Sequence, residues 1–344
     1  MPGRPPHPVK RRVMVRYVVK RLALLTITLL GVLTLTFFVS HVVPGDPARL
    51  AAGVRAKPEQ VEALRTRLGL DRPLWEQYGR YIAGVVRGDL GESIRTRRPV
   101  SADLAEYFPA TVELTLFAMA LCLLIGIPFG IVSAVRRESL IDHVSRVAST
   151  AAVSMPTFWL GLLLQLVFFR WLQVLPATGR LGFYLSPPSR ATGLYTLDSL
   201  LSGNWTALGD SLVHLILPAA ALAASSIAVI TRMTRSSLLE ILSLDYVRTA
   251  RSKGIAERVV ILKHALRNAL LPSLTVIGLQ VGVLLAGAVL IEVVFSWPGI
   301  GLYAVQSIVF VDFQAILGVT LITAIVYSGV NLIVDVLYGV IDPR

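Results

Sequence analysis

One internal segment, residues 245–272, gathers charged side chains in the otherwise apolar second half of the chain. Tyr246, Ala250 and Gly254 recur at every fourth position, so a helix here would carry them on one face. Gly254 can adopt the left-handed conformation that ends such a helix, and residues 255–271 predict a second one. This helical knob could dock a protein partner through ion pairs. A basic loop bound to anionic lipid explains the same charges.

Polar side chains inside the apolar runs form a second set of candidates, because an amide that faces lipid is costly. They are Gln165, Gln280 and Asn331, with Ser149, Ser154 and Thr157 behind them. These side chains either line a transport path or form hydrogen bonds between helices. We expect Glu292 and Asp335 near the ends of membrane spans, where hydration is cheap, and no carboxylate at mid-membrane. Proton or sodium coupling usually employs a mid-membrane carboxylate, so the pattern disfavours an ion-driven secondary carrier.

Enzymatic and metal chemistry find little support in the sequence. The chain contains neither a GxxxxGK[ST] phosphate-binding loop nor an HExxH zinc motif. The single Cys122 cannot form an intrachain disulfide, and His41 and His214 have no evident partner set for an intramembrane enzyme. We therefore expect no catalytic residue, metal or cofactor in this chain.

The composition is that of a polytopic membrane protein. The 344 residues are 54% hydrophobic and only 16% charged, with a mean hydropathy of +0.68, whereas soluble domains carry roughly 25% charged residues. The formal net charge of +12 is explained by Lys and Arg in inner-face loops rather than by nucleic-acid binding.

Six apolar runs predict six membrane spans in an all-α protein. They cover residues 17–43, 111–135, 147–171, 214–230, 272–295 and 313–338. The basic tail 1–16, predicted to be disordered, the basic loop 231–271 and the end 339–344 then face the cytoplasm. A signal peptide is the competing interpretation of the N-terminus, but its apolar run is too long and no A-x-A site follows. Residues 44–108 form a long outer loop with amphipathic helices at 58–68 and 74–86.

Several motifs in order resemble the permease subunits of binding-protein-dependent ABC importers. The segment 245–272 resembles their EAA loop, GDLG at 88–91 and FSWPG at 295–299 match two further motifs, and residues 155–161 and 338–344 match two more. Arg248-Thr249-Ala250 stands where the general signature has Glu-Ala-Ala, and Leu271-Pro272 comes later than in that signature. The longer spacing is that of the peptide and nickel branch.

The resemblance implies a six-span type I permease in a bacterial inner membrane, with a core at residues 109–338 that holds the second to sixth spans. Its partners would be a homologous second permease, two ATPase subunits that bind ATP and magnesium, and an extracytoplasmic binding protein. Residues 44–108 would form a lid that touches the binding protein, or only a spacer. Coupling to the ATPases is expected from Asp245, Tyr246, Arg248, Thr249, Ala250, Arg251, Gly254 and Arg258. The implied cargo is di- or oligopeptides, with nickel, glutathione and haem as alternatives.

Overall fold

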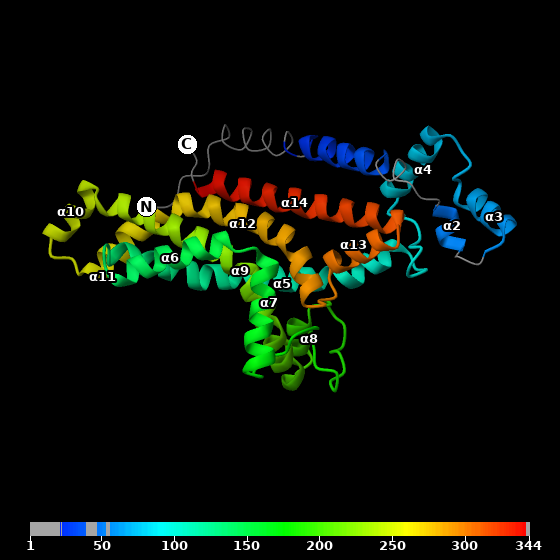
Figure 1. The fold of residues 1–344 in the computed structure, drawn as a ribbon. Helices are drawn as coiled ribbons and strands as arrows, with labels where there is room; N and C mark the ends of the chain where they lie inside the picture. Colours follow the sequence, from blue (N-terminus) through cyan, green and yellow to red (C-terminus); the bar gives the residue numbers. More distant parts are fainter. Residues whose placement is uncertain (1–20, 22, 39–46, 53–55, 342–344) are drawn as a thin grey trace. The chain divides into compact units, whose positions relative to one another are not determined.

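The computed structural model describes residues 21, 23–38, 47–52 and 56–341, and every regular element in these ranges is a helix (Figure 1). The predicted tail 1–16, both ends of the predicted first span and residues 342–344 lie outside the described residues. The predicted class, an all-α membrane protein, is confirmed.

The longest described connections between helices are residues 87–99 and residues 172–194. The helices of the first half are α2 (Pro47–Ala52), α3 (Pro58–Leu68), α4 (Leu74–Val86), α5 (Val100–Val135), α6 (Leu140–Ser154), α7 (Thr157–Leu164) and the π-helix η1 (Gln165–Trp171). Those of the second half are α8 (Tyr195–Leu201), α9 (Trp205–Leu242), α10 (Asp245–Ser252), α11 (Glu257–Val259), the π-helix η2 (Val260–Ala265), α12 (Leu266–Val294), α13 (Ile300–Val309) and α14 (Phe313–Ile341).

Four helices are long and apolar enough to cross a membrane: Val100–Val135, Trp205–Leu242, Glu257–Val294 and Phe313–Val334. Ala23–Phe38 is the described part of the predicted first span. The predicted third span, 147–171, falls on a bent pair of apolar helices, α6 and α7–η1, which meet at 107° and form either a broken span or a re-entrant loop. Pro156 explains the break, since proline disfavours the α conformation of the residue before it, and Met155 has an extended backbone (φ −88°, ψ 130°).

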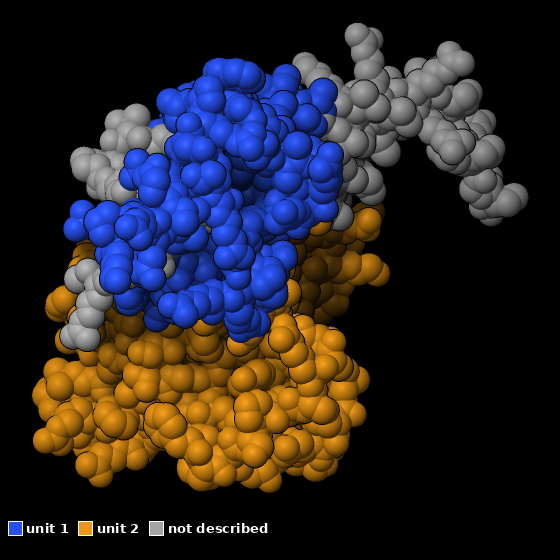
Figure 2. All heavy atoms as spheres, turned by 90° about the vertical axis from the view of Figure 1, so that its right-hand side faces the viewer, with its two compact units in different colours: residues 1–104, 306–332 blue, residues 105–305, 333–344 orange. Residues whose placement is uncertain are grey.

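The chain divides into two compact units, coloured separately in Figure 2. Unit 1 comprises residues 1–104 and 306–332, and unit 2 comprises residues 105–305 and 333–344. In unit 1, α4 packs on the helix 23–38 through the hydrogen-bonded hydroxyls of Thr34 and Tyr78, 2.6 Å apart. The segment before α5 is held by Asp312, which accepts hydrogen bonds from Ser93 Oγ (2.6 Å) and from the Arg95 backbone N–H (3.1 Å).

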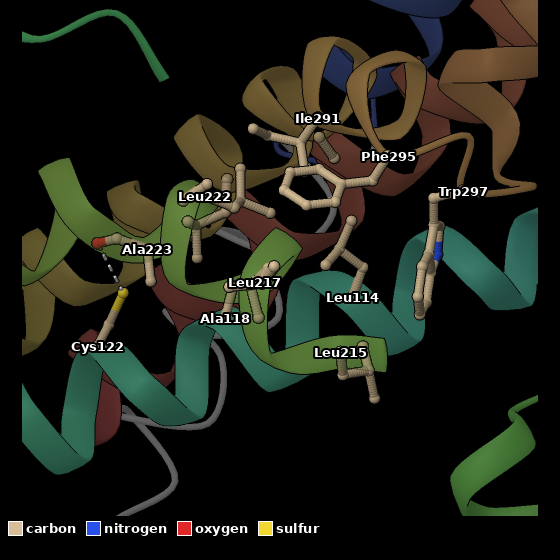
Figure 3. Close-up of a cluster of buried hydrophobic side chains, with 14 of the residues drawn as sticks. Leu114, Ala118, Cys122, Leu215, Leu217, Leu222, Ala223, Ile291, Phe295 and Trp297 are labelled. Atoms are coloured by element: carbon tan, nitrogen blue, oxygen red, sulfur yellow. Dashed lines mark hydrogen bonds between the residues drawn. The ribbon is translucent and has the colours of Figure 1, made fainter. Parts of the chain in front are cut away.

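The core of unit 2 lies where α5, α9 and α12 meet. Buried side chains from the three helices converge there: Leu114, Ala118 and Cys122 from α5, Leu215, Leu217, Leu222 and Ala223 from α9, and Ile291 from α12, beside Phe295 and Trp297 (Figure 3). Gly126 and Gly130 of α5 lie against α9. A β-carbon on Gly130 would lie 2.8 Å from the Thr231 carbonyl oxygen, and Thr231 Oγ1 donates to the Gly126 carbonyl at 3.2 Å. Helices α5 and α9 therefore approach each other at backbone distance.

Candidate functional site

The helix α10 ends as its sequence predicts. Gly254 has φ 72°, its N–H donates to the Arg251 carbonyl at 2.9 Å, and the Ile255 N–H donates to the Ala250 carbonyl at 3.4 Å. These two bonds make a Schellman motif, which satisfies carbonyls that the end of a helix leaves unpaired. The chain then turns into α11, and α10 and α11 lie together at one end of unit 2 (Figure 1).

A small apolar core holds this knob to the helices on either side of it. Val247, Ala250 and Val260 are buried and pack with Ile241, Leu242 and Ile255. This corrects one expectation. Ala250, at 8% exposed, does not lie on the free surface, because it packs inside the turn that Gly254 closes. The free surface comes from the other residues of the segment.

A polar contact ties α10 to α12. The Tyr246 hydroxyl receives a hydrogen bond from Asn268 Nδ2 at 2.9 Å, and it donates to the His264 carbonyl at 3.4 Å. Sequence reasoning missed Asn268 as Tyr246's partner. The sequence signal for this contact was a polar residue one turn after His264 in the helix predicted at residues 255–271.

The charges of the knob are partly paired within it. Arg251 binds Glu257 through two hydrogen bonds, of 2.7 and 3.1 Å, which raise the pKa of Arg251 above its ordinary value. Arg251 was expected to pair with a protein partner, but in this structure it pairs with Glu257 and links α10 to α11. Arg248, 72% exposed, lies 3.4 Å from Asp245, 96% exposed. Thr249 and Arg258 are also exposed.

Two of the predicted path residues form contacts within unit 2. The Gln280 side-chain oxygen accepts a hydrogen bond from Ser226 Oγ at 2.8 Å, which joins α12 to α9. Gln165 Nε2 donates to the carbonyls of Ala177 at 2.8 Å and Val294 at 3.1 Å. Both side chains thus make the alternative contact, a hydrogen bond between segments.

The other path candidates are Ser154, Thr157 and Asn331. Ser154 is exposed, and its hydroxyl donates to the Thr150 carbonyl of its own helix at 2.9 Å. Thr157 begins α7 and is half-buried. Asn331 belongs to unit 1, whereas the remaining candidates belong to unit 2.

Glu292 overturns the expectation of a hydrated carboxylate. It is fully buried, and its carboxylate accepts hydrogen bonds from Thr111 Oγ1 at 2.6 Å and from the N–H groups of Gly301 at 2.7 Å and Leu302 at 3.0 Å, which offset the cost of desolvation. We call these four residues the Glu292 cluster. The two backbone donors are at the N-terminus of α13, where a negative charge is favourable. The side chain of Asp335 lies outside the described part.

Sequence reasoning also missed a buried ion pair between α5 and the segment before α8. Arg180 and Glu113 lie 2.5 Å apart with side chains 5% and 4% exposed. The guanidinium carbon of Arg180 lies 3.7 Å from the centre of the Tyr195 ring. Among the described residues no group of three or more His, Cys, Asp or Glu side chains could hold a metal ion.

Two models of one known protein family match most of this chain. Residues 126–344 match the family model of the binding-protein-dependent transport system inner membrane component, and residues 14–115 match the model of its N-terminal part. A probable D,D-dipeptide transport system permease protein of Escherichia coli K12 is 50% identical over 93% of this chain and 94% of its own length. A dipeptide transport system permease protein of Alkalihalophilus pseudofirmus is 46% identical over 96% and 99%.

A glutathione transport system permease protein of Escherichia coli O6:H1 is 41% identical over 96% of this chain and 98% of its own length. All three relatives are transport components rather than enzymes, and they align over nearly their whole length with the chain described above. The chain therefore belongs to the family of binding-protein-dependent transport system inner membrane components.

Proposed function

We propose that this chain is the permease subunit of an ATP-driven importer of dipeptides. It would work with a homologous second permease, two ATPase subunits that hold ATP and magnesium, and an extracytoplasmic binding protein. Both termini and the loop 231–271 would face the cytoplasm, and residues 44–108 would meet the binding protein outside. The dipeptide permeases named above are 46–50% identical to this chain, and the glutathione permease is 41% identical. This order supports dipeptides as the cargo over glutathione.

The attachment of α10 to two long helices carries the proposed mechanism. Its buried face packs on Ile241 and Leu242 at the end of α9, and Tyr246 binds Asn268 near the start of α12. A force on the exposed face of α10 would therefore reach both helices. Arg248 and Arg258 would bind acidic groups of the ATPase, because both guanidinium groups are accessible.

The path through the membrane is proposed with fewer residues than the sequence suggested. Gln165 and Gln280 hold segments of unit 2 together, and their substitution would act first on packing. Ser154, Thr157 and Asn331 stay candidates for contact with the cargo. A path without a fixed charge suits substrates whose side chains vary.

Gly254→Glu tests the role of α10. Nothing lies within 4 Å of a β-carbon at Gly254, so the variant adds a charge to the docking face and strains only the local backbone. We expect the variant to reach the membrane and to lose dipeptide uptake. The readouts are the amount of protein in the membrane, uptake of a labelled dipeptide, and co-purification of the ATPase subunits.

Gly203→Glu is a matched control. Gly203 ends α8 with φ 69°, and it also has nothing within 4 Å of its β-carbon. The same strain and charge at that position should leave uptake unchanged. Normal uptake by Gly254→Glu, or equal losses in both variants, would contradict the assignment. Competition by glutathione, nickel or haem in the wild-type assay identifies the cargo class.

A further inference from the structure

An ion pair between buried Asp142 and half-buried Arg235 joins α6 to α9 near the C-terminal end of α9. The Asp142 carboxylate, fully buried, accepts hydrogen bonds from Arg235 Nε at 2.7 Å and Arg235 Nη2 at 2.8 Å. It also accepts from Ser133 Oγ at 2.6 Å and from the Glu138 N–H at 3.1 Å. One carboxylate thus connects the end of α5, the turn that follows it, α6 and α9.

This pair determines where α6 lies, because α6 packs with its polar face inward. Its buried residues are Asp142, Ser145 and Ser149, whereas Val144 and Val147 are 58% and 70% exposed. Apolar burial therefore contributes little to the contact between α6 and α9. A two-bond Arg–carboxylate pair fixes both distance and orientation, which small serine side chains do not.

The ion pair lies beside the helices that carry the knob. Arg235 precedes Ile241 and Leu242 on α9, and these two residues pack against the core of α10. Ala134, next to Ser133, packs with Leu238 of α9, Ala265 of η2 and Ala269 of α12. A displacement of α10 would therefore be transmitted through these packed residues to the Asp142–Arg235 pair.

We propose that Asp142 and Arg235 are positioning residues for coupling, which make α6 move together with α9 when the ATPase displaces α10. The proposal rests on the proposed function. The pair transmits the movement of α9 to α6, which bends into α7 at Pro156. Without the pair, ATP hydrolysis continues while α6 no longer follows, so fewer dipeptides enter for each ATP hydrolysed.

The test uses the full complex with its ATPases and binding protein in proteoliposomes, with uptake and ATP hydrolysis measured together. Arg235→Leu should lower the uptake per ATP about tenfold or more, a typical size for coupling between sites. Arg146→Leu is the matched control, because Arg146 is an exposed arginine of α6 and belongs to no assigned site. It should leave the ratio unchanged.

A double variant, Asp142→Leu with Arg235→Leu, separates positioning from stability. Removing one partner of a buried pair is destabilising, whereas replacing both by apolar residues is often neutral. We expect the double variant to be more stable thermally than Arg235→Leu, which leaves the buried carboxylate without its counter-charge, and to keep the low uptake per ATP. It stays less stable than the wild type, because Ser133 Oγ and the Glu138 N–H lose their acceptor. Arg235→Lys, which keeps the charge but lacks the planar two-bond fork of arginine, should give an intermediate ratio.

Spin labels on Arg146→Cys and Glu240→Cys, in a Cys122→Ala background, report the α6–α9 distance directly. Both labelled positions are exposed. In the wild type, the distribution of distances between the two labels should stay narrow with and without trapped nucleotide. Arg235→Leu should broaden this distribution. Wild-type uptake per ATP in the double variant, or an unchanged distance in Arg235→Leu, would overturn the proposal. A wild-type complex without binding-protein-dependent dipeptide uptake would instead refute the proposed function.

Discussion

The knob at residues 245–272 and the Glu292 cluster both connect long helices, but they do so by different kinds of contact. In the knob, the bonded pairs are close in sequence: Arg251 and Glu257 are six residues apart, and Tyr246 and Asn268 are 22 apart. All four side chains are exposed. In the cluster, Thr111 and Glu292 are 181 residues apart and buried. Local contacts between exposed residues leave a pattern in the sequence, whereas the Thr111–Glu292 bond exists only once α5 and α12 have met.

Space around glycine separates the two regions as well. A β-carbon at Gly254 would have nothing within 4 Å, whereas a β-carbon at Gly301 would lie 2.5 Å from the Val289 Cα. The knob is an open surface that can accept a partner. The Glu292 cluster is closed packing, which suggests that changes there act on stability before they act on binding.

The largest effect is expected from Glu292→Leu. The substitution leaves Thr111 Oγ1 and the N–H groups of Gly301 and Leu302 without their acceptor, and we expect a loss of about 3 kcal/mol or more in the free energy of unfolding. Thermal unfolding of the purified protein in detergent measures it. Glu292→Gln keeps one acceptor oxygen and should cost less.

Glu240→Leu is the control for this prediction, because Glu240 is exposed on α9. It should change stability by no more than about 0.5 kcal/mol. If Glu292→Leu unfolded at the same temperature as Glu240→Leu, the difference between a closed cluster and an open knob would disappear.

An intermediate effect is expected from Gly301→Ala. The added methyl group would meet backbone at Val289, which cannot rotate away, so we expect a loss of about 2 kcal/mol. Gly254→Ala adds only left-handed strain and should cost about 1 kcal/mol. The measurement is again thermal unfolding, with the two variants side by side. Equal losses would show that steric crowding does not distinguish the regions.

The smallest effect is expected from Arg251→Gln. The Arg251 and Glu257 side chains are 41% and 53% exposed, and such pairs contribute less than about 1 kcal/mol and weaken with salt. The unfolding curves of this variant and the wild type should differ at low salt and coincide at high salt. A large loss that salt does not alter would place the knob in the same class as the Glu292 cluster.

Particular residues show where sequence reasoning reached its limit. Gly254 was predicted correctly, because a glycine after an amphipathic segment is a local signal. Ala250 was placed on the wrong side of the knob, because the spacing of small residues does not tell whether they face a partner or their own chain. Glu292 was predicted to be interfacial from its place near the end of a span, since hydropathy ignores the donors that α5 and the start of α13 bring to it.

The sequence by itself determined the membrane class, the approximate spans, the family resemblance and the turn at Gly254. Each follows from hydrophobicity, charge or backbone preference within a short stretch of chain. Only the tertiary structure decided that α6 turns its polar face inward, that Arg235 pairs with Asp142, and that Glu292 binds the start of α13. Those choices depend on which buried donor meets which acceptor, and packing of distant helices brings them together.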